Sequence, residues 1–141
     1  MTGWRLGYAA GPAEVVAQMT KLQQYTFVCA PSPLQYAAVA ALDVPMDDAV
    51  AAYRRKRDIA FQTLSAKFEV VKPEGAFYIY PKAPQGQTAS DFVSRAIDNN
   101  VLIIPGNVFS ERDTHFRISY ATTDSKLRHG CEILCKLAGD A

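Results

Sequence analysis

The stretch Val101–Ala121, VLIIPGNVFSERDTHFRISYA, is the part of the sequence that decides the fold. A short apolar run, Val101–Ile104, stops at Pro105-Gly106, and a charged, turn-rich loop leads to a second strand-like run, His115–Ala121. Strict alternation within the second run predicts one buried face, made of Phe116, Ile118 and Tyr120. We therefore expect two strands, the second of which is buried on one face only.

The open face of the second run carries a single arginine, Arg117, between His115 and Ser119. Strand formers on both sides hold this arginine on a rigid element, and its planar fork suits two-point recognition of a carboxylate. The same pattern also fits an ordinary strand arginine that pairs with a surface acid. The residues alone leave both interpretations open.

Three segments stand out along the chain: MTGWRLGYAAG at residues 1–11, PEGAFYIYP at Pro73–Pro81, and PGNVFS…FRISYA in the stretch quoted above. In this order and spacing they resemble the class I/II aminotransferases of fold type I, the aspartate aminotransferase-like family. The resemblance implies pyridoxal 5'-phosphate as cofactor, with an amino acid and a 2-oxo acid as substrates of the intact enzyme. It also implies that Arg117 binds the substrate α-carboxylate and that Arg5 contacts the cofactor phosphate.

The resemblance places the family's Schiff-base lysine just upstream of the position of Met1, and none of the lysines present has the matching context. Amino transfer through this cofactor needs that amine. We therefore expect the C-terminal portion of an aminotransferase, with no catalytic residue of its own, that is inactive alone and does not hold the cofactor covalently. The alternatives are the same fragment of a related pyridoxal-phosphate lyase, and a noncatalytic folding or oligomerisation module.

Composition sets wider limits on the function. The chain has 141 residues, 49% of them hydrophobic, which is enough for a globular fold with a real core. Fifteen basic and fourteen acidic residues give a net charge of +1, which argues against a nucleic-acid binder or a polybasic membrane anchor. No apolar run reaches membrane-spanning length.

Three cysteines, an odd number without framework spacing, favour the reducing cytoplasm. Cys131 and Cys135 stand four residues apart on an expected helix. Because no second pair lies nearby, this spacing predicts buried core side chains, and we assign no metal ligands.

We expect an α/β chain made of two parts. Residues 1–45 are interpreted as a remnant of the large cofactor-binding domain, with a strand at Arg5–Ala10 and two helices. Residues 46–141 are interpreted as the C-terminal small α+β domain, with helices on one side of a sheet. Apolar faces and a strand edge without neighbours drive association, so we expect residues 1–45 to pack on another copy of the chain as a homo-oligomer.

Within the second part, a long helix is expected at Met46–Ala66, and its basic run Arg54–Arg57 is expected to be a solvated face. A hairpin is expected from Phe68–Val71 and Ala76–Tyr80 around Gly75, at the edge of the sheet or of a substrate pocket. A helix capped by Thr88 or Ser90 should run through Asn99 with Phe92, Val93, Ala96 and Ile97 inward, and Thr123 or Asp124 should cap the last helix. Gly106 is expected to adopt a backbone conformation closed to larger residues.

Overall fold

The computed structural model describes residues 2–139, and the chain divides into two compact units, Met1–Met46 and Asp47–Ala141. Among the described residues, the buried hydrophobic core runs from Ile59 to Leu134, so it lies entirely within the second unit. No helix of residues 2–139 is both long enough and apolar enough to cross a membrane.

The first unit contains the short 3-10 helix η1 (Thr2–Trp4) and the helices α1 (Ala13–Gln24) and α2 (Ser32–Ala41). Both helices begin directly after a proline, where the fixed φ angle suits a helix start. The prediction of a strand at Arg5–Ala10 is wrong, since this segment has no regular structure and Arg5 has a φ of 52°. A strand needs a ladder partner for its backbone groups, and this unit contains no other strand among its described residues.

The first unit has no core of its own. Neither α1 nor α2 contains a buried residue. Large apolar and aromatic side chains are exposed instead, with Tyr8 at 87% and both Tyr25 and Tyr36 at 80% exposure. Side chains of this size normally stabilise a fold by leaving water, and here they do not.

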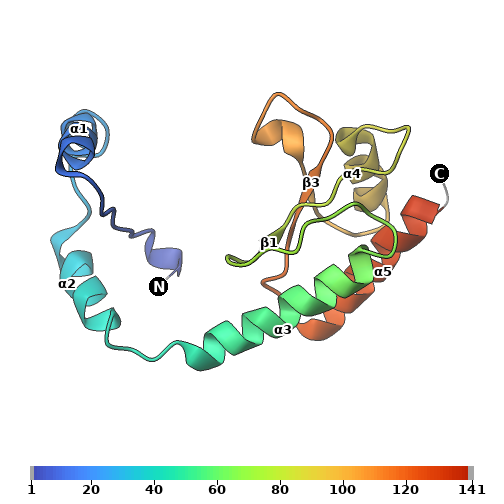
Figure 1. The fold of residues 1–141 in the computed structure, drawn as a ribbon, viewed down its shortest axis with the longest axis horizontal. Coiled ribbons are helices and arrows are strands. Elements are labelled where there is room, and N and C mark those ends of the chain that lie inside the picture. Colours follow the sequence, from blue (N-terminus) through green and yellow to red (C-terminus); the bar gives the residue numbers. More distant parts are fainter. Residues whose placement is uncertain (1, 140–141) are drawn as a thin grey trace. The chain divides into compact units, whose positions relative to one another are not determined.

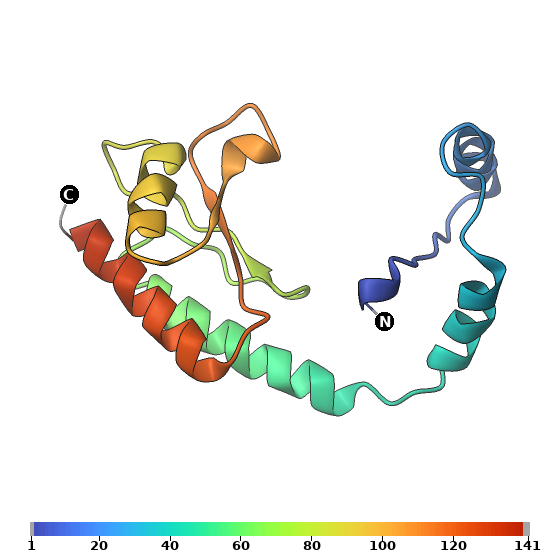
Figure 2. The same cartoon turned by 180° about the vertical axis from the view of Figure 1, so that it is seen from behind.

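The second unit begins with helix α3 (Asp47–Leu64) and continues through strand β1 (Tyr78–Ile79) and helix α4 (Ala89–Asp98). Strand β2 (Ile104–Pro105), the 3-10 helix η2 (Gly106–Val108), strand β3 (Phe116–Ser119) and helix α5 (Asp124–Gly139) follow. The sheet is antiparallel with the order β1-β3-β2. Figures 1 and 2 both show α3 and α5 side by side, and the two helices are in contact.

The alternation predicted for β3 is confirmed. Phe116, Ile118 and Tyr120 are 0%, 7% and 1% exposed, and they share one cluster with buried residues of α3, α4 and α5. The rings of Phe68, Phe92 and Phe116 lie 5.0 to 5.6 Å apart between centroids. Burying each such ring contributes roughly 1.5–3 kcal/mol, so this face of the sheet anchors the second unit. The helices therefore cover one side of the sheet.

The expected hairpin does not form, because Phe68–Val71 is not a strand and β1 pairs with β3 instead. Tyr78 lies opposite Ser119 and Ile79 opposite Ile118. This register places Ile79, 1% exposed, on the buried face beside Ile118. Burying Ile79 beside Ile118 favours this pairing more than the turn at Gly75 favours a hairpin. For this reason β1 pairs with the distant strand β3.

The first strand of the quoted stretch is also shorter than predicted, since the paired residues are Ile104–Pro105 rather than Val101–Ile104. The reason is the end of α4, where Asn100 takes a φ of 62° and the Val101 N–H donates to the Ala96 carbonyl at 2.9 Å. This Schellman arrangement ties Val101 to the helix.

The predicted starts of the last two helices are confirmed. At α4, Thr88 is the cap and its hydroxyl oxygen accepts from the Asp91 N–H at 3.1 Å. At α5, the Thr123 hydroxyl accepts from the Lys126 N–H at 3.4 Å. Ile97 is the exception on α4, because its side chain is 50% exposed rather than inward.

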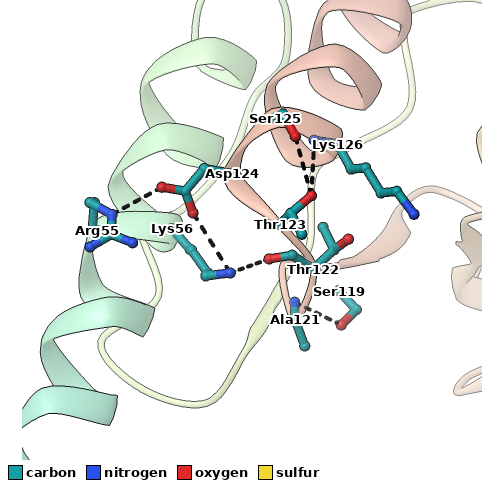
Figure 3. Close-up of polar contacts among 9 residues, drawn as sticks. All are labelled: Arg55, Lys56, Ser119, Ala121, Thr122, Thr123, Asp124, Ser125 and Lys126. Carbon is teal, nitrogen blue, oxygen red and sulfur yellow. Dashed lines mark hydrogen bonds and ion pairs between the residues drawn. The ribbon is translucent and has the colours of Figure 1, made fainter.

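The basic run of α3 is only in part the solvated face that was expected, because Arg54 and Arg55 are exposed whereas Lys56 and Arg57 are half-buried, and Arg55 and Lys56 make ion pairs (Figure 3). Arg55 Nε lies 3.0 Å from Asp124 Oδ2, and Lys56 contacts both Asp124 and the Thr122 carbonyl. Arg57 pairs with Asp58 at 2.9 Å. Two of these cations therefore tie α3 to the loop that leaves β3, at the end of the strand that carries Arg117.

Candidate carboxylate-binding site

The central residue of the site is Arg117, on β3 opposite Ile104 of β2. Its Cζ atom lies 4.4 Å from the ring centroid of Tyr78 and 4.3 Å from that of Phe109. Tyr78 belongs to β1, and Phe109 follows β2 and η2, so the two rings come from strands on opposite sides of β3. The guanidinium thus contacts two aromatic rings, one from β1 and one from the turn after β2, at distances typical of cation–π contacts.

The hydrogen-bond donors of Arg117 remain available. Its residue is half-buried, and within residues 2–139 no acid pairs with it. No buried side-chain nitrogen or oxygen in the described part of the chain lacks a partner, so these donors face solvent. Guanidinium N–H bonds lie in the plane of the group, and the free edge of that plane can offer two parallel hydrogen bonds to a carboxylate.

A second stack lies beside the first on the same open face of the sheet. The rings of Tyr80 and His115 are parallel to within 8°, with centroids 5.2 Å apart. The His115 Nδ1 atom is 2.8 Å from the Thr114 hydroxyl. His115 is thus engaged in packing just before β3.

Gly106 is required at this site, but not for the predicted reason. Its φ is not in the left-handed region, since Gly86 is the glycine with a positive φ among the described residues. A Cβ atom at position 106 would instead lie 2.3 Å from the Tyr80 hydroxyl and 2.6 Å from the His115 carbonyl oxygen. The close approach of the Tyr80–His115 stack therefore excludes any side chain here.

The turn before β1 is held by a buried tyrosine. Ala76, rather than Gly75, takes the left-handed conformation, with a φ of 59°. The Tyr120 hydroxyl donates to the Ala76 carbonyl at 3.0 Å, and burial raises the pKa of Tyr120. This bond fixes the backbone two residues before Tyr78, and so fixes one of the two rings beside Arg117.

Sequence reasoning found Arg117 but missed Phe109 and Tyr78 as its partners. The alternation of tyrosines on the open face of β1 is a usable signal for Tyr78, because the cross-strand register then places it near Arg117. Phe109 lies in a loop without periodicity. Its contact with Arg117 follows from the β2–β3 pairing and from the turn of η2, which local patterns do not reveal.

Of the two cysteines predicted to be buried core side chains, Cys131 is buried, whereas Cys135 is half-buried and packs against the core. Cys131 is 1% exposed, and burial raises its pKa to about 12. The Cys135 thiol donates to the Thr63 carbonyl at 3.3 Å. Within residues 2–139, no group of three or more histidine, cysteine, aspartate or glutamate side chains could hold a metal ion.

The chain belongs to the aminotransferase class I and II family, because the model of that family matches residues 1–134. Within that family, it has the architecture of the fold type I pyridoxal-phosphate aminotransferases over part of their length. The family resemblance inferred from the sequence is confirmed.

Over the aligned residues, the relatives are about one third identical to the chain. A probable aspartate aminotransferase of Methanocaldococcus jannaschii is 38% identical over 132 residues, which is 86% of this chain and 35% of the relative. An aromatic aminotransferase structure from Pyrococcus horikoshii is 33% identical with a TM-score of 0.82, over 99% of this chain and 40% of that one. An aspartate aminotransferase structure from Thermotoga maritima is 28% identical with a TM-score of 0.83, over 99% and 37%. The chain thus spans little more than a third of these proteins.

The family implies pyridoxal phosphate, so the described residues were compared with what that cofactor requires. Arg5, the residue expected at its phosphate, is exposed and belongs to the first unit, whereas Arg117 belongs to the second. A Cβ atom built on Gly3 or Gly7 meets nothing within 4 Å. Among the described residues, the first unit therefore offers an exposed cation for a phosphate, without close neighbours at Gly3 and Gly7, and these residues alone do not make a complete cofactor site.

Proposed function

We propose that this chain supplies the carboxylate-binding part of a pyridoxal-phosphate aminotransferase. The whole protein would transfer an amino group between an amino acid and a 2-oxo acid. The observation that carries the proposal is the geometry of Arg117, whose guanidinium contacts two rings while its donors have no partner among residues 2–139. A fork held in this way suits the carboxylate that both substrates share. The names of the relatives, which include aspartate and aromatic aminotransferases, support this reaction.

Arg5 is proposed as a contact of the cofactor phosphate in the whole protein. Its motif resembles that of the family, and its exposed guanidinium is free to reach an anion. A guanidinium is well matched to phosphate oxygens.

The 141 residues alone are proposed to be inactive and to hold no covalent cofactor. None of the lysines stands in the family's context for the cofactor-binding amine. Three of them are also engaged by carboxylates: Lys56 by Asp124, Lys72 by Asp58 and Lys82 by Glu69. Purified chain supplied with cofactor, an amino acid and a 2-oxo acid should form no new amino acid.

The carboxylate-binding role is tested by titrating the chain with pyruvate, a 2-oxo acid with one carboxylate. The Arg117 Nε–H resonance should shift saturably in an NMR spectrum. Arg117→Lys keeps the charge but loses the fork, and affinity should fall about tenfold, since a charge-assisted hydrogen bond contributes roughly 1.5 kcal/mol or more.

The matched control for this titration is Arg128→Lys, because Arg128 is exposed on α5. It makes the same chemical change away from the site and should leave pyruvate affinity unchanged. Equal affinity in wild type and Arg117→Lys, with each titration followed on shared backbone amides, would contradict the proposed role of Arg117.

A second candidate function is a noncatalytic association module. The exposed apolar surface of α1 and α2, which have no buried residue, favours it. We propose that copies of the chain associate through the first unit as a homo-oligomer, because such a surface gains free energy by leaving water. The three free cysteines favour the cytoplasm as the compartment. A related pyridoxal-phosphate lyase is less favoured, since the relatives named above are all aminotransferases.

A further inference from the structure

We propose that Phe109 is a positioning residue for Arg117. Tyr78, which is held by the sheet, is the second ring that the guanidinium contacts. Their ring centroids lie 4.3 and 4.4 Å from the Arg117 Cζ atom. Two rings at these distances restrict how the guanidinium can rotate, and its N–H edge is the part left for a ligand. The inference rests on the proposed function, in which that edge binds a carboxylate.

Tyr78 is fixed by the sheet itself. Its backbone is paired with Ser119 on β3, and its ring lies 4.5 Å from that of Phe77. The Tyr120 hydroxyl secures the turn just before it through the Ala76 carbonyl. The backbone of Tyr78 cannot move away from Arg117 without disrupting the pairing of β1 with β3.

Phe109 is held by different means. It ends η2, outside the sheet, and it is 50% exposed. Its N–H donates to the Gly106 carbonyl at 2.9 Å, and the Gly106 N–H donates to the His115 carbonyl at 2.7 Å. These two bonds connect the turn that carries Phe109 to β3, two residues from Arg117.

The exposure of Phe109 indicates what the ring does. A half-exposed ring at the end of a short turn adds less to the core than the fully buried Phe92 and Phe116. Its close contact is with the cation. A long arginine side chain loses rotational freedom when it binds a ligand, and ordering it beforehand reduces that loss. Phe109 therefore contributes to affinity through Arg117 without touching the carboxylate.

The test compares wild type with Phe109→Leu and Phe109→Tyr by NMR on the full chain. The first measurement is the rate of rotation about the Nε–Cζ bond of Arg117 without ligand. The second is the affinity for pyruvate. We expect Phe109→Leu to speed the rotation and to weaken pyruvate binding about three- to tenfold, the size of the entropy lost when one long side chain is ordered. Phe109→Tyr keeps an aromatic ring and should restore both values.

The control is Phe27→Leu, the same substitution at a phenylalanine of the first unit that is 68% exposed. It should change neither value. Equal rotation rates in wild type and Phe109→Leu would overturn the positioning role, and so would faster rotation in Phe109→Leu with unchanged pyruvate affinity. The rotation rate needs no ligand, so it decides the positioning role even if pyruvate does not bind. Arg117→Lys separately tests the carboxylate-binding role.

Discussion

At the scale of single residues, the neighbours of Arg117 decide what its guanidinium can bind. Two rings, those of Tyr78 and Phe109, lie against the group. The edge of the plane remains, and a planar anion matches it. Gly106 permits this arrangement, because it has no side chain. The Tyr80 hydroxyl and the His115 carbonyl can therefore lie close to the turn that leads to Phe109.

Gly106→Ala tests this dependence. The added Cβ atom would lie 2.6 Å from the His115 carbonyl oxygen, which belongs to the backbone and cannot rotate away. We expect the free energy of unfolding in urea to fall by about 1–3 kcal/mol, as in other overpacked sites. Pyruvate affinity should fall as well, because the turn that carries Phe109 has to shift.

The matched control is Gly130→Ala, on α5, where the nearest heavy atom to an added Cβ is Val101 Cγ1 at 4.0 Å. Alanine is the better helix former, so this variant should gain up to about 1 kcal/mol. If Gly106→Ala and Gly130→Ala changed the free energy of unfolding in the same direction, the claim that neighbouring atoms exclude a side chain at Gly106 would be contradicted.

At the scale of elements, the loop between β3 and α5 is fixed by α3. Arg55 and Lys56 both reach Asp124, which stands at the start of α5 (Figure 3). The hydrogen bond from Arg55, and then the charges of Arg55 and Lys56, hold the pKa of Asp124 below its ordinary value of 3.8 against the opposing effect of desolvation. The carboxylate also suits the positive end of the helix.

This contact predicts a pH dependence of stability. The folded state lowers the pKa of Asp124, so its contribution is present above the unfolded-state value of 3.8 and is lost as the pH falls through the lower folded-state value. Asp124→Asn should therefore lower the melting temperature near neutral pH. The difference from wild type should shrink as the solution is acidified below pH 3.8.

Circular dichroism melts across this pH range measure the effect. Asp43→Asn, an exposed aspartate of the first unit, makes the same change of charge and should give a melt like that of wild type at each pH. A constant difference between Asp124→Asn and wild type at all pH values would show that the carboxylate charge is not involved.

At the scale of the whole molecule, the two units differ in what stabilises them. The buried core of the described residues lies between Ile59 and Leu134, whereas α1 and α2 contain no buried residue. A unit without a core cannot offset the loss of chain entropy on folding. The second unit therefore contains both the buried core that stabilises the fold and the candidate carboxylate-binding residue Arg117.

Separate expression of the two units tests this difference. Residues 47–141 should unfold cooperatively, with a melting temperature within about 5 °C of the full chain, which corresponds to roughly 1 kcal/mol for a domain of this size. Residues 1–46 should show no cooperative transition. Loss of the transition in residues 47–141 would show that the first unit contributes to the core.

The same truncation tests association. Sedimentation should show the full chain as an oligomer and residues 47–141 as a monomer, because the exposed apolar surface of α1 and α2 is removed. If the full chain and residues 47–141 had the same oligomeric state, whether monomeric or oligomeric, association through the first unit would be contradicted.

The sequence by itself determined the family, the helices and the buried face of β3. Helices follow from local signals such as Thr88 at a cap and proline at a start, and alternation in Phe116, Ile118 and Tyr120 reflects the geometry of a strand. These features depend on neighbours in the chain, which the sequence contains.

Only the tertiary structure decided the pairing of β1 with β3, the closure of space above Gly106 and the contacts of Arg117 with Tyr78 and Phe109. Each joins segments that are distant in the chain, and burial rather than local preference selects among their possible partners. The same holds for Arg55 and Lys56, whose run of charge resembles a solvated face until Asp124 is brought beside it.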